Sequence, residues 1–241
     1  MNNEWSTTTG TATGPYHLLR GIPNQDSVMV HEANGILLLA VSDGAGSLAN
    51  SDLGSLTAVT AAAKTLGEVS EASVDSAAFI VESAAQAVLD LEETEVGCTL
   101  AVVLLAGDNW ATAGVGDSFS VIRADGAFHM FSSEPQELAN LTELLTTRDY
   151  DIWSADGTGA DAAAVSSDGL EHLTLSKREA VPGFWGGIFA RSSTGDFNIQ
   201  RLVDYLELSQ VLDDDTTVAV ASRSLQRQDD EQQSPEVEAE A

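Results

Sequence analysis

The chain has 241 residues and a formal net charge of −28 at neutral pH. Such a charge excludes a protein that binds nucleic acid or anionic membranes through its overall electrostatic field. No apolar run approaches the roughly 20 residues that span a bilayer, and the first residues lack the basic and apolar regions of a signal peptide. The single cysteine, Cys98, excludes an intrachain disulfide and fits a reducing compartment. We therefore expect a cytoplasmic, monomeric protein without nucleic-acid or membrane partners.

The first part of the chain predicts a hairpin of two strands. Met1 to Gly14 is either a frayed start or contains an edge strand around Trp5 to Thr13, and Tyr16 to Ser27 favours a loop. Ser27 to Glu32 and Ile36 to Ser42 follow as strands, and Asn34-Gly35 between them is typical of a tight turn because both residues tolerate positive φ. The second strand is apolar almost throughout, which favours burial on both of its faces.

Two helices and a series of short strands are predicted next. Apolar spacing indicates helices from Asp52 to Leu66, with Ser51 or Asp52 as N-cap, and from Val74 to Glu92, with Ser73 as N-cap. Strands are then predicted at Cys98–Leu105, Trp110–Val115, Phe119–Arg123, Phe128–Phe131, Tyr150–Ser154, Ala162–Ser166 and Thr216–Ala221. Further helices are predicted at Glu134–Leu145, Pro182–Arg191 and Asp196–Leu208, and a turn at Asp156-Gly157. The short, closely spaced strands indicate antiparallel pairing.

Strands and helices are segregated along the chain rather than strictly alternating. This arrangement favours an α+β fold over a doubly wound sheet. We predict one domain over residues 1–222. Residues 223–241 are polar and acidic and cannot bury enough apolar surface to become ordered, so they are predicted to form a disordered tail.

Aspartates recur at the ends of the predicted strands. Asp26 precedes the first strand of the hairpin and Asp43 follows the second, while Asp117 and Asp168 follow later strands and Asp213–Asp215 precedes the closing strand. Buried unpaired carboxylates are costly, and several at one edge of a sheet repel one another. The chain has few Lys and Arg to place among them, so divalent cations such as Mg²⁺ or Mn²⁺ explain the set best. Ordinary turn aspartates in an acid-rich chain are the alternative.

The order of these motifs resembles that of metal-dependent serine/threonine protein phosphatases of the 2C type. The motifs are Asn24-Gln25-Asp26-Ser27, Asp43-Gly44-x-Gly46, Gly116-Asp117-Ser118, Ser167-Asp168-Gly169 and Asp214-Asp215-x-Thr217-Val218. Each is weak alone, but five in this order, spread over Tyr16 to Ser222, are fairly specific. The segment from His17 to Ser27, H-x-x-x-G-x-P-N-Q-D-S, looks like the shorter bacterial branch.

The resemblance implies a four-layer α-β-β-α sandwich of two antiparallel sheets, with the metal site between the sheets at one end. It also implies hydrolysis of phosphoserine and phosphothreonine on proteins by a water that bridges two Mn²⁺ or Mg²⁺ ions. By the same resemblance, Asp43 bridges the two metals and the carbonyl of Gly44 is a backbone ligand. Asp168 and Asp214 are direct ligands of the first metal, and Asp26 holds metal-bound water.

The resemblance leaves several positions open. Asp117 corresponds to the ligand of a third, weaker metal, where Asp168 takes part again. Gln25 stands where many members have Glu, so we expect the second metal to bind more weakly. Arg20 is either the phosphate clamp of the family or a solvated loop charge. His17 is either a general acid or outer-shell partner, or a loop histidine whose hydrogen bonds are satisfied by the backbone.

The sequence therefore predicts a bacterial signalling phosphatase that acts on a phosphorylated protein, such as a Ser/Thr kinase or its target. Gln25 and Arg20 motivate an alternative, a catalytically weak phosphatase-like module that binds a phosphoprotein or a kinase. A third hypothesis is a metal-dependent phosphatase of small molecules. The chain offers no convincing Ser-His-Asp or Cys-Arg motif, and a metal-activated water makes a protein nucleophile unnecessary.

Overall fold

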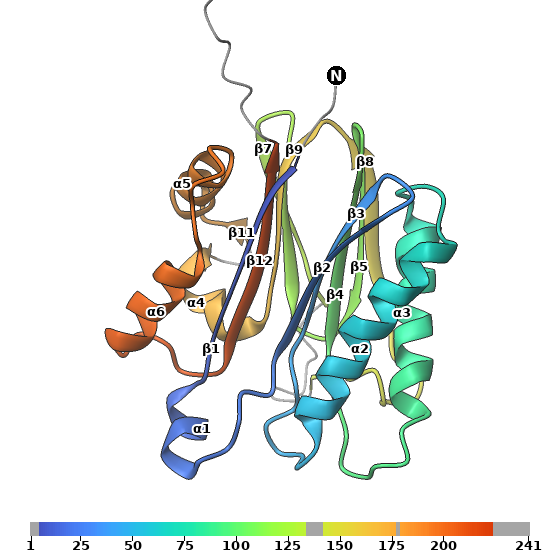
Figure 1. The fold of residues 1–241 in the computed structure, drawn as a ribbon, viewed down its shortest axis with the longest axis vertical. Helices are drawn as coiled ribbons and strands as arrows, with labels where there is room; N and C mark the ends of the chain where they lie inside the picture. The colour runs from blue at the N-terminus through green and yellow to red at the C-terminus, as the bar shows by residue number, and fades with distance from the viewer. Residues whose placement is uncertain (1–4, 134–141, 177–178, 224–241) are drawn as a thin grey trace, which may run out of the picture.

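Two five-stranded sheets lie face to face in the computed structural model of the chain, which describes residues 5–133, 142–176 and 179–223 (Figure 1). One sheet has the order β1 (Trp5–Ala12), β12 (Thr216–Arg223), β9 (Ala160–Ser166), β6 (Phe119–Ala124) and β7 (Ala127–Phe131). The other has the order β2 (Ser27–Ala33), β3 (Ile36–Ser42), β4 (Leu100–Ala106), β5 (Asn109–Val115) and β8 (Trp153–Thr158). All neighbouring strands are antiparallel.

Helices cover the outer face of each sheet. Helices α2 (Ser51–Thr65) and α3 (Val74–Leu89) cover the sheet that contains β3, and α5 (Pro182–Ser192) and α6 (Gln200–Leu208) lie on the other side of the sandwich. The remaining short elements are α1 (Pro15–Arg20), α4 (Glu171–Thr174), the 3₁₀ turns η1 (Leu66–Glu68) and η2 (Asp168–Leu170), and the paired strands β10 (Leu175–Ser176) and β11 (Glu179–Ala180). The predicted four-layer α-β-β-α sandwich is confirmed. Among the described residues, no helix is both long enough and apolar enough to cross a membrane.

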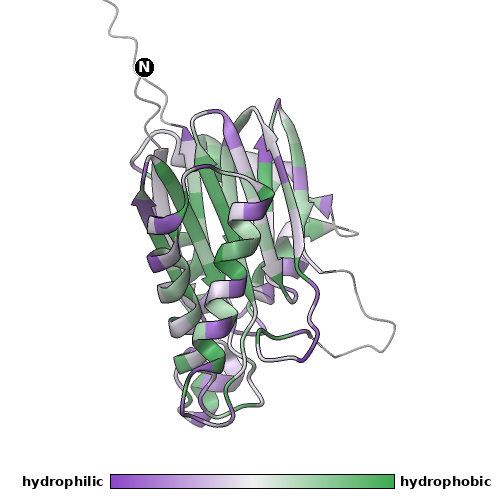
Figure 2. Cartoon of the chain, turned by 90° about the vertical axis from the view of Figure 1, so that its right-hand side faces the viewer, coloured by the Kyte–Doolittle hydropathy of each residue, from purple (hydrophilic) through white to green (hydrophobic). Residues whose placement is uncertain are grey.

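Strand β3 is buried along its whole length, as its apolar sequence predicts. Leu38 and Ala40 pack in the cluster beneath α2 and α3, and Leu37, Leu39 and Val41 pack in the cluster between the two sheets. Burying a side chain of this kind contributes about 1.5–3 kcal/mol. Figure 2 shows hydrophobic residues running along the strands, behind helices with polar outer positions. The strand that carries Asp43 is therefore held firmly on both faces.

Several local predictions are confirmed. Asn34 and Gly35 join β2 to β3 with φ values of 55° and 74°, the positive angles that a two-residue hairpin turn requires. The N-terminal segment is an edge strand, because β1 pairs with β12 alone. Ser73 caps α3, since its Oγ accepts a hydrogen bond from the Ser76 N–H at 3.3 Å.

The predicted loop from Tyr16 to Ser27 is wrong in its first part, which forms α1. Pro15 lies in the first helical turn, where a missing N–H costs nothing. Gly21 ends the helix with a φ of 66°, and its N–H donates to main-chain carbonyls of the helix. Both signals are present in the sequence, but six residues are too few to show apolar periodicity.

The predicted turn at Asp156-Gly157 is also wrong, because both residues lie inside β8. Gly157 pairs with Trp110 of β5, and a Cβ on it would lie 2.7 Å from Cζ2 of the Trp110 ring. Glycine is present here for close approach rather than for a turn. The chain reverses instead at Gly159, where φ is 77°, and the predicted strand from Tyr150 begins only at Trp153.

Helix boundaries differ by a few residues from the predictions. The N-cap of α2 is Asn50 without a side-chain hydrogen bond, and Ser51 Oγ instead donates to the Ala45 carbonyl at 2.9 Å. Helix α3 ends at Leu89, and α6 begins at Gln200. The predicted helix Glu134–Leu145 falls mostly on residues 134–141, outside the described residues. The predicted tail, apart from Arg223 at the end of β12, also lies outside them.

Replacing Gly157 with Ala should destabilise the fold. The new Cβ would press against the Trp110 indole, and overpacking of this kind costs about 1–3 kcal/mol in free energy of unfolding. Urea denaturation measures the change. Gly187→Ala is the matched control, because no neighbouring atom lies within 4 Å of its added Cβ and Ala favours the helical conformation of α5. Equal midpoints for Gly157→Ala and the wild type would contradict the expectation.

Candidate metal centre

Strand ends from both sheets bring aspartates to one end of the sandwich. Asp43 follows β3, Asp26 precedes β2 and Asp117 follows β5 in one sheet, while Asp168 follows β9 and Asp214 precedes β12 in the other. Strands β3 and β5 both pair antiparallel with β4, so the C-terminal ends of β3 and β5 lie at the same end of the sheet. Carboxylate oxygens of Asp43, Asp117 and Asp168 lie within 4.8 Å of one another. Three residues that are far apart in sequence thus form one cluster.

The Asp43-Gly44 turn is fixed by its neighbours. The Asp43 N–H donates to Thr99 Oγ1 at 3.1 Å, and the Asp43 carbonyl accepts from the Thr99 N–H at 2.8 Å. A Cβ on Gly44 would lie 2.5 Å from the Gln25 carbonyl oxygen and 2.8 Å from its Cβ. Only glycine at this position lets the turn pack against the segment before β2, which brings Asp43 next to Asp26.

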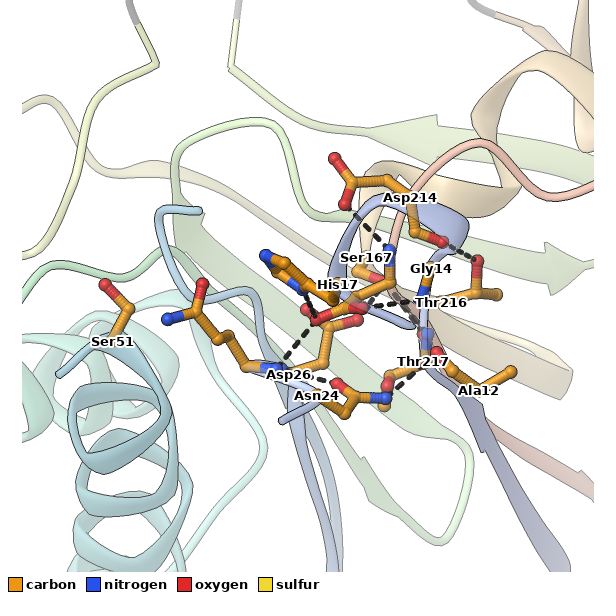
Figure 3. Close-up of polar contacts among 12 residues, drawn as sticks. Ala12, Gly14, His17, Asn24, Asp26, Ser51, Ser167, Asp214, Thr216 and Thr217 are labelled. Carbon is orange, nitrogen blue, oxygen red and sulfur yellow. Dashed lines mark hydrogen bonds and ion pairs between the residues drawn. The ribbon is translucent and has the colours of Figure 1, made fainter. Parts of the chain in front are cut away.

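Asp26 is held from one side and unpartnered on the other. Its Oδ2 accepts a hydrogen bond from Ser167 Oγ at 2.8 Å, and Ser167 Oγ accepts from the Thr217 N–H at 2.9 Å (Figure 3). Asn24 Oδ1 accepts from the Asp26 N–H at 2.8 Å and fixes its main chain. The other carboxylate oxygen, Oδ1, is buried and has no hydrogen-bond partner among the described residues.

Burial and mutual repulsion make these carboxylates hard to ionise. Burial raises the pKa of Asp43 well above its ordinary value, and the neighbouring Asp26, Asp168 and Asp117 raise it further. Burial raises the pKa of Asp168 to about 7, with added repulsion from Asp117 and Asp214. Burial also raises the pKa of Asp26 to about 7, although the hydrogen bond from Ser167 acts against this change. The pKa of Asp214 is raised too, chiefly by burial.

The donor set fits hard divalent cations. Among the described residues, no Lys or Arg forms an ion pair with Asp26, Asp43, Asp117 or Asp168. Carboxylate oxygens with uncompensated negative charge and an unpartnered buried oxygen are what Mg²⁺ and Mn²⁺ bind. The residues present could therefore hold such ions, with Asp43, Asp117 and Asp168 at the centre.

Asp117 has a further partner that sequence reasoning did not single out. Thr142 Oγ1 donates a 2.6 Å hydrogen bond to Asp117 Oδ2. Hydrogen bonds of this kind orient a carboxylate toward a metal. Thr142 carries no motif, and no signal in the sequence links it to a residue that lies 25 positions earlier.

Asp214 belongs to a second cluster beside the first. Its carboxylate lies within 4.8 Å of ligand atoms of His17 and Asp215. Asp214 is also close enough to Asp168 to raise the pKa of that residue. Asp214 is therefore the member of the second cluster that acts electrostatically on the first.

Asp215, to which the sequence assigns no role, organises this second cluster. Its Oδ1 accepts the Gly14 N–H at 2.6 Å, and its Oδ2 accepts the Gln25 N–H at 2.7 Å and contacts His17 Nδ1 at 2.8 Å. This buried carboxylate thus ties the start of α1, the segment before β2 and the start of β12 together. The one signal in the sequence is its place in an acidic run directly before a buried strand.

The two basic residues of α1 point in different directions. His17 is buried, and its Nδ1 is hydrogen-bonded to the Asp215 carboxylate. A side chain therefore satisfies this ring nitrogen, not the backbone. Arg20 is exposed, and its guanidinium carbon lies 3.7 Å from the centre of the Tyr16 ring. This contact matches a solvated loop charge, and the role of Arg20 as a phosphate clamp stays a prediction.

Comparisons with known proteins agree with this geometry. The sequence profile of the protein phosphatase 2C family matches residues 13–207. A comparison with curated protein sequences finds no match.

Several solved structures share the fold. A serine/threonine phosphatase of S. agalactiae superposes with a TM-score of 0.66 and 17% identity over 92% of this chain and 100% of its own. The catalytic domain of PstP, in complex with two manganese ions, gives a TM-score of 0.64 and 18% identity over 92% and 99%. Stp1 of Staphylococcus aureus gives 0.64 and 15% over 92% and 96%. At these identities the likeness establishes the fold.

The raised pKa values predict how pH acts on the stability of the chelator-treated protein. Asp26 and Asp168 have folded pKa values of about 7 against an ordinary 3.8, so between these values the folded state binds more protons than the unfolded state. Their contribution to the free energy of unfolding is therefore present at low pH and lost as the pH rises toward 7. Thermal unfolding in EDTA at several pH values measures it.

Asp26→Asn is the control variant for this effect, because an amide cannot titrate. Its stability in EDTA should fall less with rising pH than that of the wild type. Since Mn²⁺ binds the deprotonated carboxylates, it should raise the melting temperature more at pH 8 than at pH 5.5. Identical pH slopes for the wild type and Asp26→Asn would contradict the expectation.

Proposed function

Since the chain belongs to the protein phosphatase 2C family, we propose that it is a metal-dependent enzyme that hydrolyses phosphoserine and phosphothreonine on proteins. The observation that carries this proposal is the cluster of Asp43, Asp117 and Asp168, whose oxygens lie within 4.8 Å at the ends of three strands. Their uncompensated charge suits the cations that bind phosphate esters.

The residues of the site divide into ligands and supporting groups. Asp43 would contact two cations, and the Gly44 carbonyl, Asp168 and Asp214 would complete their protein ligands. Asp26 would accept a hydrogen bond from water through its unpartnered Oδ1. Two Mn²⁺ or Mg²⁺ ions bound there would supply an activated water and neutralise charge on the phosphoryl group.

Roles are also proposed for residues around these ligands. Asp117, oriented by Thr142, would hold a third ion. Gln25 supplies a neutral oxygen where many members have a carboxylate, so the second ion would bind more weakly. The roles of His17 as general acid and of Arg20 as phosphate clamp stay predictions.

Finer points of the proposal rest on the sequence and on the family resemblance. They are a bacterial signalling role, a cytoplasmic location, a monomeric state and a phosphorylated protein partner such as a Ser/Thr kinase or its target. One domain over residues 1–222, followed by a tail, is proposed likewise.

Asp43→Asn and Asp168→Asn should each lower kcat for p-nitrophenyl phosphate with Mn²⁺ by at least about 100-fold. Each variant removes an anionic ligand, and the bound ions contribute several kcal/mol at 1.36 kcal/mol per tenfold in rate. Asp125→Asn is the matched control, because this residue lies in the turn between β6 and β7 with a φ of 50°, which Asn tolerates. A wild type no faster than the two ligand variants would contradict the proposed function.

A binding module without turnover is the second candidate. The stacking of Arg20 on Tyr16, on the exposed side of α1, favours it over an enzyme, because the guanidinium here contacts an aromatic ring rather than a group of the metal centre. Calorimetric titration with Mn²⁺ separates the two functions. Two or more sites together with turnover are expected for the enzyme, and a single tight site without turnover would support the module.

A further inference from the structure

Buried and exposed residues of helix α1 are reversed relative to an ordinary amphipathic helix. Surface helices bury their apolar side chains and expose their polar ones. In α1 the buried residue is His17, whereas Tyr16, Leu18 and Leu19 are 52%, 57% and 87% exposed. The helix therefore presents three large apolar side chains to solvent, which we call the apolar surface of α1.

Hydrogen bonds to Asp215 fix α1 in this orientation. His17 Nδ1 is hydrogen-bonded to the Asp215 carboxylate at 2.8 Å, and the N–H of Gly14, directly before the helix, donates to the same carboxylate at 2.6 Å. Buried polar atoms that lose their partners are costly. The helix therefore cannot rotate to bury Leu18 and Leu19 without breaking these bonds, so the exposure of the two leucines is a lasting property of the fold.

The apolar surface of α1 lies beside the candidate metal centre. Ligand atoms of His17, Asp214 and Asp215 lie within 4.8 Å of one another, and Asp214 is one of the proposed metal ligands. Figure 1 shows α1 at the end of the sandwich where β2 and β12 begin. A protein whose phosphorylated residue reaches the aspartates therefore passes close to α1.

A second copy of the chain fits this surface poorly. Stable interfaces bury about 800 Å² on each partner, whereas a helix of six residues is about 9 Å long. Each copy also carries a net charge of −28, so contact through α1 would bring two sets of clustered carboxylates together. Residues 224–241 are acidic and contain few large apolar residues, so the same repulsion disfavours them as occupants.

A short apolar segment of a substrate matches the surface in size and in chemistry. Three exposed side chains are enough to cover one or two side chains of an extended peptide, and removing apolar surface from water is favourable. The negative charge of the chain disfavours acidic residues at the same positions of the substrate. Uncharged, apolar residues next to the phosphorylated residue are therefore the best match.

We propose that Tyr16, Leu18 and Leu19 form a docking surface for apolar residues that flank the phosphorylated residue of a protein substrate. The proposal rests on the proposed phosphatase function and names the kind of substrate on which that function acts. Because these side chains belong to neither carboxylate cluster, they contribute to substrate binding and leave the chemical step unchanged.

Phosphopeptides that differ only in their flanking residues test the docking surface. KM is measured with Mn²⁺ for three phosphothreonine peptides of equal charge. One has two leucines before the phosphorylated residue, one has two leucines after it, and one has serines at all four positions. In the wild type, at least one leucine peptide should have a KM about tenfold lower than the serine peptide, because part of a leucine side chain leaves water on binding.

Replacing Leu18 and Leu19 together with Ser should abolish this preference. Serine is uncharged, so the substitutions remove apolar surface without changing the electrostatic field. The kcat for p-nitrophenyl phosphate should stay at the wild-type value, which also shows that the variant is folded. Leu19→Ala is a milder change at the most exposed of these residues, and it should weaken the preference.

Phe79→Ser is the matched control. Phe79 is also a large apolar residue, 41% exposed, and it lies in the first half of α3, which begins at the opposite end of the sandwich from α1 (Figure 1). This variant should keep the wild-type preference for the leucine peptide.

Equal KM values for the three peptides in the wild type would overturn the docking surface, and so would an unchanged preference in the Leu18→Ser/Leu19→Ser variant. A lower KM for the leucine peptides in that variant would mean that another part of the chain covers α1, and would also overturn it. So would light scattering that shows a wild-type dimer and a monomeric variant. A wild type that hydrolyses neither p-nitrophenyl phosphate nor any peptide contradicts the proposed function itself, whereas hydrolysis of every substrate without preference contradicts the docking surface alone.

Discussion

Repulsion among partly buried carboxylates at one end of the sandwich is the constraint around which this structure is arranged. Asp26 and Asp168 have pKa values raised to about 7, and each pKa unit corresponds to about 1.4 kcal/mol. The fold sustains this unfavourable arrangement because the strands that end there are held elsewhere. Strand β3 is packed against apolar side chains on both faces. Asp43 therefore cannot move toward solvent without disturbing two clusters of apolar side chains.

Neighbouring aspartates differ in whether their carboxylate oxygens have hydrogen-bond donors. Asp215 is buried and satisfied, with two main-chain N–H groups and an imidazole as donors. Asp26 is partly buried and keeps one oxygen without a partner among the described residues, and the Asp43 carboxylate lies close to those of Asp117 and Asp168. A satisfied carboxylate holds segments together, whereas an unsatisfied one is available to a cation. Hydrogen-bond partners, more than residue type or position in a motif, therefore separate the structural aspartates from the candidate ligands.

Local signals in the sequence were enough to predict much of the fold. Asn34-Gly35 between two apolar runs predicts the β2–β3 hairpin, and Ser73 predicts the start of α3, because turns and caps depend on nearby residues. The aspartates that gather at the candidate metal centre were also singled out in advance, through their order along the chain. The Asp156-Gly157 turn was wrong because a ring from another strand, Trp110, decides what glycine does there.

The remaining features of the site depend on contacts between residues that are far apart in the sequence, and no local sequence pattern predicts such contacts. Asp215 and His17 are 198 residues apart and meet only when β12 pairs with β1, the strand that leads into α1. Thr142 meets Asp117 only because the chain returns to the end of β5. No spacing rule connects such pairs, since their proximity is a property of the whole sheet arrangement.

The segment before β2 shows how one short stretch contacts both the carboxylate cluster around Asp43 and the cluster around Asp215. Asp26 points toward Ser167 and Asp43, while the Gln25 main chain binds Asp215 and its side chain faces Gly46. A glutamate at position 25 would lose the N–H that binds the Leu48 carbonyl and would add another negative charge beside a cluster already short of cations. A neutral amide instead keeps an acceptor in place without that repulsion. The departure from the common carboxylate at Gln25 thus keeps the side chain bound to the Leu48 carbonyl without adding charge to the cluster.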